Sequence, residues 1–271
     1  MSLKNINSLF LIGAGKMGMA MARGWLKSDL KPSSLTLIDP KPQQSTIDFA
    51  AKHKISILPN MPDIDAQIVV LAVKPQIMEQ VLNSIKPYIK PDVLVLSIAG
   101  GIKLENLSKT LGSKKIIRAM PNTPAQVGQG VTGAVKADGV SKSDIKIANA
   151  LMQASGDVHW FDNEDDLDAL TFVSGCGPAY VFLLAEAMEQ AGVEQGLEEE
   201  KAKILARQTV IGAAALMQDD ASDAAILRKN VTSPGGITEA ALSVLMADDG
   251  FSSLFSRAFK KAAKRNEELG S

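Results

Sequence analysis

Three glycines at fixed spacing follow the first apolar run of the chain. Leu9–Ile12 is a short run of residues that favour β-strands, and Gly13, Gly15 and Gly18 come directly after it. An alanine- and methionine-rich stretch of helical character comes next, so the segment has the strand, turn and helix of a βαβ unit. In such a unit Gly13 permits the tight turn, Gly15 keeps a Cβ away from an approaching ligand, and Gly18 lets the helix pack closely on the sheet. The spacing therefore predicts a parallel α/β fold for the N-terminal part of the chain.

The start of this helix also predicts a ligand. Unpaired N–H groups and the positive end of the helix dipole suit the phosphates of a dinucleotide. We expect the turn to bind the pyrophosphate of a nicotinamide cofactor; the alternative is a glycine turn that serves packing alone. The predicted binding residues of the turn are Gly13, Ala14, Gly15, Lys16, Met17 and Gly18.

Asp39 ends the second predicted strand, about 20 residues beyond the turn. An acidic residue there accepts hydrogen bonds from the adenine ribose hydroxyls of NAD and repels the 2′-phosphate of NADP. The alternative is that Asp39 and Pro40 only start a loop, since Asp-Pro commonly initiates turns, and that Lys41 supplies positive charge to a phosphate. Both NAD and NADP therefore stay open as cofactors.

Short apolar runs alternate with amphipathic stretches over the first 120 residues, which is typical of a doubly wound α/β sheet of the Rossmann type. The expected strands are Leu9–Ile12, Leu35–Ile38, Ile55–Leu58, Ile68–Val73, Val93–Ile98 and Lys115–Arg118. The helices between them are expected near 16–27, 45–53, 77–85 and 104–111. Two more strands, near 131–135 and 158–161, flank a helix near 142–155 and close the sheet. We assign residues 1–164 to this domain.

From residue 165 onward strand patterns vanish, and we expect an all-helical domain over residues 165–271. Helical periodicity covers 179–191, 198–217, 221–229, 238–247 and 251–268. The stretch Ile204–Met217 is apolar around most of its circumference, which predicts burial on several sides. In so small a domain this favours burial against a second subunit, so we expect an oligomer.

Composition narrows the class of protein. Lys and Arg number 29 against 30 Asp and Glu, so no strong field points to nucleic acid or an anionic membrane. The single cysteine, Cys176, and the two histidines argue against disulfides and a zinc site and favour a reducing compartment. Apolar runs such as Ile68–Val73 fall far short of the ~20 residues that span a bilayer. We expect a soluble, cytoplasmic protein without a metal.

The segments that follow three of the strands are further candidates for the cofactor site, because ligands of open parallel sheets bind at the carboxyl ends of the strands. These segments are small, glycine-rich or stiffened by proline, which suits backbone lying flat against a ribose or a nicotinamide ring. The alternative is plain strand-to-helix turns, with Lys74 as a surface lysine. The candidates are Ala72, Val73, Lys74, Pro75, Ala99, Gly100, Met120 and Asn122.

Two segments of the helical half combine glycine, proline and hydroxyl residues. Residues 174–180 place Pro178 near the start of a helix, after glycines that let backbone come close to a ligand. Residues 231–238 form a loop that leads into another helix N-terminus, with hydroxyl side chains around exposed amides, and this suits a carboxylate. Each segment, taken alone, is also compatible with an ordinary capped helix start.

Together these segments resemble the pyrroline-5-carboxylate reductases, which catalyse the last step of proline synthesis. The resemblance covers essentially the whole chain, and its specific motifs are RAMPNTP at 118–124 and TSPGG at 232–236. It implies a Rossmann domain, a helical domain for dimerisation and substrate binding, and reduction of 1-pyrroline-5-carboxylate to L-proline with NADPH or NADH. It also implies a homodimer, which in this family often assembles further into a decamer.

The resemblance implies site residues as well. It places the substrate carboxylate against Ser233, Gly235 and Gly236 and the ring nitrogen near the hydroxyl of Thr238, and we assign Ser174 to the same substrate site. Hydride attack on a cyclic imine depends mainly on positioning, so no histidine or lysine acid is obligatory. We therefore hypothesise that Thr238 is the catalytic residue and hydrogen-bonds the ring nitrogen.

Two residues depart from the family pattern. The family usually has a hydroxyl residue where this chain has Ile237, whose backbone N–H can still donate. It usually has a serine where this chain has Cys176, which we do not interpret as a nucleophile.

Two rival functions remain. A 3-hydroxyacid dehydrogenase resembles this layout but needs a lysine in the helix that begins near Pro178, where none stands, and a sensing module would have lost catalysis.

Overall fold

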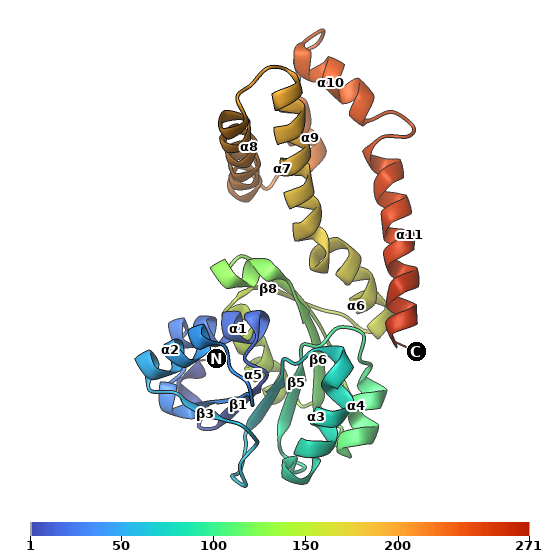
Figure 1. The fold of residues 1–271 in the computed structure, drawn as a ribbon. Coiled ribbons are helices and arrows are strands. Elements are labelled where there is room, and N and C mark those ends of the chain that lie inside the picture. The colour runs from blue at the N-terminus through green and yellow to red at the C-terminus, as the bar shows by residue number, and fades with distance from the viewer. Residues whose placement is uncertain (1, 271) are drawn as a thin grey trace. The chain divides into compact units, whose positions relative to one another are not determined.

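The computed structural model describes residues 2–270, and these form two compact units (Figure 1). Among the described residues, the first unit comprises 2–176 together with 266–270, and the second comprises 177–265. Residues 165–176, which the sequence analysis assigns to the second domain, group with the first unit. The first unit is a sheet with helices on both faces, and the second consists of helices.

An eight-stranded sheet is the frame of the first unit, in the order β3-β2-β1-β4-β5-β6-β7-β8. The strands are β1 (Leu9–Ile12), β2 (Leu35–Ile38), β3 (Ser56–Leu58), β4 (Ile68–Leu71), β5 (Leu94–Ser97), β6 (Ile116–Pro121), β7 (Gly130–Lys136) and β8 (Gly156–Trp160). Every predicted strand is present, with its ends shifted by no more than a few residues.

Alternate side chains of the strands enter two cores, one on each face of the sheet. In β1, Leu9 and Leu11 belong to one core, and Phe10 and Ile12 belong to the other. This is the period of two that a strand buried on both faces imposes. The first core is covered by α1 (Lys16–Lys27), α2 (Gln44–His53) and α5 (Lys142–Gln153), and the second by α3 (Met78–Ile85) and α4 (Leu104–Leu111). The predicted doubly wound, Rossmann-type fold is confirmed.

One strand departs from the parallel arrangement. β7 runs antiparallel to β6, with Arg118 opposite Val135 and Pro121 opposite Thr132. A short 3-10 segment, Thr123–Val127, makes the connection, and so short a link cannot carry the crossover that a parallel neighbour needs. β8 then runs parallel to β7, because α5 supplies that crossover.

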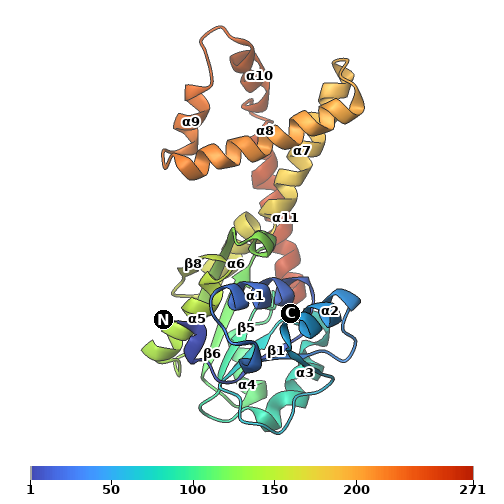
Figure 2. The ribbon, with the colours of Figure 1, turned by 90° about the vertical axis from the view of Figure 1, so that its left-hand side faces the viewer.

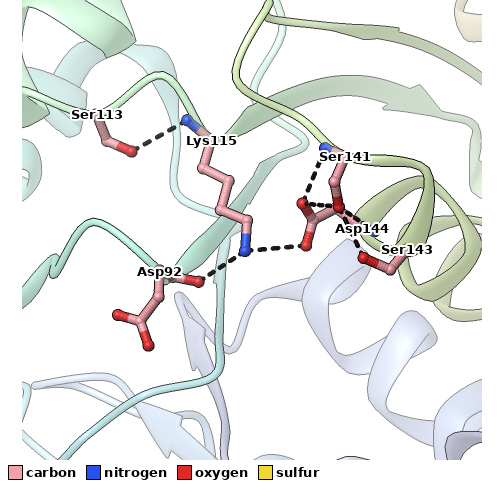
Figure 3. A network of polar contacts seen from close by, with 6 residues as sticks. All are labelled: Asp92, Ser113, Lys115, Ser141, Ser143 and Asp144. Atoms are coloured by element: carbon pink, nitrogen blue, oxygen red, sulfur yellow. Dashed lines mark hydrogen bonds and ion pairs between the residues drawn. The ribbon is translucent and has the colours of Figure 1, made fainter.

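A polar network fixes the start of α5 (Figure 3). The Ser141 hydroxyl accepts the N–H of Asp144 at 3.2 Å, and the Asp144 carboxylate accepts the N–H of Ser141 at 2.9 Å, which together form a capping box. The Lys115 ammonium lies 3.1 Å from the other carboxylate oxygen and donates to the Asp92 carbonyl at 2.9 Å. Burial raises the pKa of Asp144, but the hydrogen bonds from Ser141 and the charge of Lys115 outweigh it, so the pKa is lowered overall.

A helix that the sequence analysis did not predict follows β8. This helix, α6 (Glu164–Leu170), begins at Asn163, whose side chain accepts the N–H of Asp166 at 2.9 Å. Its first turn is acidic, as suits the positive end of a helix dipole. It was missed because so short a helix has too few apolar positions to show a helical period.

A π-helical turn, η6 (Thr171–Gly175), continues α6. In it the N–H of Cys176 donates to the carbonyl of Thr171, five residues back, at 2.9 Å. The helix α7 (Gly177–Glu194) follows, so Pro178 is its second residue, and the expected helix start near Pro178 is confirmed. The sequence analysis missed only the π-helical turn before it, from which Cys176 separates α7.

The second unit consists of helices in the residues that the structure describes (Figure 2). The helices are α7 (Gly177–Glu194), α8 (Glu199–Asp219), α9 (Ala224–Asn230), α10 (Ile237–Leu245) and α11 (Phe251–Gly270). α8 packs across α7, where Ala202 and Ala206 are buried. The Tyr180 ring of α7 meets the Phe255 ring of α11 edge to face, with centroids 5.6 Å apart.

Many apolar side chains of these helices are exposed in the single chain. Ile204 of α8 is 63% exposed and Met217 is 58% exposed in the single chain, so the predicted burial of this stretch needs a second subunit, as the sequence analysis expects. A surface of this kind marks an interface with another protein or with a membrane. One helical run, Glu164–Glu194, is long and apolar enough to cross a bilayer by length and composition, a test that covered helices of soluble proteins also pass.

Candidate functional site

The glycine turn joins β1 to α1 in the middle of the sheet. Gly13 has φ +92°, a conformation that favours glycine, and a Cβ there would lie 2.7 Å from the carbonyl oxygen of Ala72. A Cβ on Gly18 would lie 2.5 Å from the carbonyl oxygen of Gly13. A Cβ on Gly15 would meet no atom within 4 Å. Packing therefore requires glycine at positions 13 and 18, whereas Gly15 borders open space that a ligand can enter.

The first turn of α1 faces that space without a side-chain cap. Its N-cap residue is Gly15, which has no side chain to accept the first N–H groups of the helix. The N–H groups of Lys16 and Met17 are therefore available to an anion. Lys16 is exposed, and Met17 packs against the core. Open space beside Gly15 and uncapped amides together fit the pyrophosphate of a dinucleotide.

Asp39 at the end of β2 holds the glycine turn. One carboxylate oxygen accepts the N–H of Ala14 at 3.0 Å, and the other accepts the N–H of Lys41 at 2.9 Å. The second contact is the loop-starting geometry that the Asp39-Pro40 alternative predicts. Each oxygen keeps a lone pair for a ribose hydroxyl. Asp39 thus orders the turn itself, whichever dinucleotide the turn binds.

The chain segment after β4 reaches the same turn. β1 lies between β2 and β4, so the carboxyl end of β1 is the switch point at which open α/β sheets bind ligands. Ala72 and Val73 pack against Gly13, where a Cβ would lie 2.8 Å from Cγ1 of Val73. Lys74 and Pro75 are exposed, and no described contact joins them to the turn. The structure therefore brings two of these four predicted residues to the turn.

The ends of β5 and β6 meet each other at this edge of the sheet. A Cβ on Gly100 would lie 3.2 Å from Cε of Met120, so these two predicted residues are neighbours. The side chain of Ala99 is buried, and only its backbone can face a ligand.

Asn122 follows β6, and both ends of its side chain are bound within the first unit. The amide nitrogen donates to the Ser174 carbonyl at 3.1 Å, and the amide oxygen accepts the N–H of Val131 at 2.9 Å. The residue is 8% exposed. Its side chain is therefore engaged within the protein, and the predicted contact of Asn122 with the cofactor stays a prediction.

Ser174 lies in the π-helical turn. Its hydroxyl donates to the Leu170 carbonyl at 3.3 Å, so toward a ligand it acts as an acceptor. Cys176 is half-buried, and its backbone N–H closes the π-helical turn.

A buried ion cluster anchors α6, and the sequence analysis missed it. Arg118 on β6 is 1% exposed, and its terminal nitrogens lie 2.7 Å from Glu164 and 2.6 Å from Asp168. Glu164 also accepts the N–H of Leu104, at the start of α4, at 3.0 Å. The spacing of Glu164 and Asp168, four residues apart on one helix face, was the only sequence signal for this cluster. It does not identify their partner, because Arg118 lies 46 residues before Glu164 in the chain.

The loop before α10 presents two hydroxyls. Among the hydrogen bonds of residues 2–270, none engages the hydroxyl of Ser233 or of Thr238, and both residues are exposed. Thr232 differs, because its hydroxyl donates to the Arg228 carbonyl at 2.6 Å. Ile237 is 92% exposed and contributes only its backbone N–H, in the uncapped first turn of α10.

The two glycines of this loop already have hydrogen-bond partners. The N–H of Gly235 donates to the Glu239 carboxylate at 2.8 Å, and the N–H of Gly236 donates to the Ser233 carbonyl at 3.0 Å. The Ser233 hydroxyl and the first N–H groups of α10 are therefore available to a substrate carboxylate. To bind the N–H of Gly235 as well, the substrate has to displace the Glu239 carboxylate. Among residues 2–270, no group of three His, Cys, Asp or Glu side chains is placed to hold a metal.

Two family models match the chain. The model described as "Pyrroline-5-carboxylate reductase dimerisation" matches residues 164–269, and the model described as "NADP oxidoreductase coenzyme F420-dependent" matches residues 8–101. The first match begins at α6, and the second contains β1 to β5.

Relatives match over nearly the full length. Pyrroline-5-carboxylate reductase of Pseudomonas aeruginosa is 39% identical over 261 residues, which is 95% of each chain. A pyrroline-5-carboxylate reductase structure from Coxiella burnetii has a TM-score of 0.89 at 34% identity, and the match covers 98% of this chain and 100% of that one. The Plasmodium falciparum pyrroline carboxylate reductase with NADP bound has a TM-score of 0.85 at 33% identity and covers 99% of each chain.

Proposed function

The chain belongs to the pyrroline-5-carboxylate reductase family, and on this premise we propose which of its residues perform the reaction. It is an oxidoreductase that reduces 1-pyrroline-5-carboxylate to L-proline with NAD(P)H, the last step of proline synthesis. The reaction adds a hydride to the imine carbon and a proton to the ring nitrogen. The protein therefore has to hold a dinucleotide, a carboxylate and a ring nitrogen in defined places.

The first unit holds the cofactor. The reduced nicotinamide, when bound, supplies the hydride. Uncapped N–H groups at the start of α1 bind the pyrophosphate beside Gly15, and Asp39 keeps the turn in shape by binding the N–H of Ala14. The residues that we assign to the cofactor site are Gly13, Ala14, Gly15, Lys16, Met17, Gly18, Asp39, Ala72, Val73, Lys74, Pro75, Ala99, Gly100 and Met120.

The loop before α10 holds the substrate. We assign the substrate carboxylate to the Ser233 hydroxyl and to the amides of the loop and of the first turn of α10, where the helix dipole favours an anion. The hydroxyl of Thr238 then hydrogen-bonds the ring nitrogen, which orients the imine for hydride attack. The free, exposed hydroxyl of Thr238 on this helix N-terminus is the observation that carries the assignment. Gly235 and Gly236 complete the proposed substrate loop, and we propose Ser174, in the first unit, as a further residue for substrate use.

Substitution of Thr238 tests the assignment. We expect Thr238→Ala to lower kcat/KM for 1-pyrroline-5-carboxylate by about 10- to 100-fold, the range for one lost hydrogen bond to a reacting group. Thr238→Ser keeps the hydroxyl and should stay within about threefold of the unchanged protein, since propensity and packing differ little. Consumption of NADH and of NADPH, followed side by side at 340 nm, gives the rates and the cofactor preference. Full kcat/KM in Thr238→Ala would remove Thr238 from the reaction.

The second unit mediates oligomerisation, which the match to a dimerisation domain supports. We propose a homodimer in which exposed apolar side chains such as Ile204 and Met217 are covered by the partner, and further assembly toward a decamer. We also propose a cytoplasmic protein whose partners are the small substrate and the second subunit, without nucleic acid or membrane. Ultracentrifugation of the purified protein tests the assembly, and recovery in the membrane pellet of a cell lysate would contradict the location.

A further inference from the structure

The carbonyl of Ser174 lacks the donor that an α-helix would give it. In a regular helix this carbonyl would accept the N–H four residues ahead, and that residue is Pro178, which has no N–H. The proline ring also crowds the carbonyl four residues back, and the π-helical turn Thr171–Gly175 lies at this point of the chain. Ser174 is half-buried, and a carbonyl that is partly shielded from water is destabilising without a partner, so a donor from elsewhere in the fold stabilises it.

Asn122 supplies that donor. Its amide nitrogen reaches the Ser174 carbonyl at 3.1 Å from a segment 52 residues earlier in the chain. The other end of the amide accepts the N–H of Val131 at 2.9 Å, one residue beyond the last β6–β7 pair, Pro121 with Thr132. Because each end has a partner that matches only one orientation, the amide is fixed, and its nitrogen faces Ser174.

The helix before the turn is held from the same strand. Arg118, four residues ahead of Asn122, binds Glu164 and Asp168 of α6 at 2.7 and 2.6 Å. The arginine fixes the body of α6, and the asparagine fixes the turn that follows it. Both contacts lie within the first unit.

We propose that Asn122 is a positioning residue for the reduction: its amide replaces the hydrogen bond that Pro178 removes and thereby sets the π-helical turn that carries Ser174. The inference rests on the proposed place of Ser174 in the substrate site. It differs from cofactor binding by Asn122, because it makes substrate use, and not cofactor affinity, depend on this side chain.

Asn122→Asp tests the proposal, because it keeps the shape and the acceptor for Val131 and removes the donor to Ser174. Near pH 8 the introduced carboxylate faces a carbonyl, and kcat/KM for 1-pyrroline-5-carboxylate should fall about tenfold, as for a half-buried carbonyl that loses its donor. The dissociation constant of NADPH without substrate, from fluorescence titration, should change less than about twofold, because no cofactor contact is lost. Burial and the facing carbonyl raise the pKa of the introduced carboxyl. The activity ratio to the unchanged protein should therefore rise as the pH falls from about 8 toward about 5, since the protonated carboxyl again donates.

Asn149→Asp is the matched control. Asn149 uses only its amide oxygen, as acceptor for the Trp160 indole at 3.2 Å, so the change keeps its bond and should leave activity and its pH dependence unaltered. If Asn122→Asp does not fold, Asn122→Ser is the second test. The serine side chain is too short to reach the Ser174 carbonyl, so kcat/KM should fall as in Asn122→Asp while the NADPH dissociation constant stays unchanged. Because serine does not ionise, this loss should be independent of pH. A parallel rise in the NADPH dissociation constant, unaltered kcat/KM, or a pH-independent ratio in folded Asn122→Asp would overturn the proposal. The wild-type assay reports separately on the proposed function, since turnover there persists if only this inference fails.

Discussion

Asp144→Asn should destabilise the first unit by about 2–3 kcal/mol at neutral pH. The carboxylate accepts two hydrogen bonds from Ser141, from its N–H at 2.9 Å and from its hydroxyl at 2.6 Å. Both bonds are charge-assisted, and a neutral acceptor weakens each by about 1 kcal/mol. The ion pair with Lys115, whose side chain is 25% exposed, adds about 0.5–1 kcal/mol after solvent screening.

The dependence on pH identifies the charge as the cause. The pKa of Asp144 is lowered in the folded protein, so the carboxylate contributes its full stabilisation above the unfolded value, near 4, and loses it as the pH falls through the folded value. The difference between the unchanged protein and Asp144→Asn should therefore stay constant from pH 7 to pH 5. It should narrow as the pH falls below about 4 and close below the lowered pKa of the folded protein, where both side chains are neutral.

Tryptophan fluorescence in urea is a suitable assay, because both tryptophans of the chain report on α5. The indole of Trp25 donates to the Leu151 carbonyl at 2.8 Å, and that of Trp160 donates to Asn149 at 3.2 Å. Asp138→Asn, an exposed carboxylate ahead of the same helix, is the control and should change stability by less than about 0.5 kcal/mol. A difference below about 0.5 kcal/mol for Asp144→Asn at pH 7, or one that persists unchanged at pH 3, would refute the reasoning.

Two further predictions concern the ligand loops. Gly15→Ala should raise the NADPH dissociation constant at least about tenfold without changing the urea midpoint, because its Cβ enters the open space beside the turn. Gly18→Ala should instead lower the free energy of unfolding by about 1–3 kcal/mol, because its Cβ meets backbone. Equal losses of stability in the two variants would contradict this. Glu239→Gln should lower KM for 1-pyrroline-5-carboxylate about threefold, because a neutral amide holds the Gly235 N–H less tightly. Glu199→Gln is the control for it, and an unaltered KM in Glu239→Gln would mean that substrate does not use Gly235.

The glycine turn could be predicted because its signals are local. Gly13 and Gly18 are required by contacts within one βαβ unit, and the helix that follows, Lys16–Lys27, begins and ends as its sequence predicts. Local signals also predicted that Asp39 starts a loop, because an Asp side chain in an Asp-Pro pair accepts the N–H two residues ahead, here that of Lys41. What they could not give was its bond to Ala14, which joins two segments that are neighbours only in the sheet.

The π-helical turn could not be predicted for the opposite reason. Two glycines and a proline within residues 175–178 favour a break in a helix, and local preference does not favour a π-helical turn directly before them. The turn persists because Asn122 supplies a hydrogen bond from another part of the first unit, and Arg118 holds the preceding helix. Tertiary contacts thus override the local preference, and the pairing of Arg118 with two acids leaves no periodic trace in the sequence.

The two units should respond differently to dilution. The apolar side chains of α8 and α10, such as Ile204 at 63% and Ile237 at 92% exposed, lie in the unit that oligomerises, so the stability of this unit is linked to protomer concentration. The capping box of α5 lies within the first unit, whose two cores are complete inside one chain. The effect of Asp144→Asn on tryptophan fluorescence should accordingly be independent of protein concentration. The proposed site uses residues of both units, so loss of activity on dilution with unchanged tryptophan emission would place the failure in the second unit.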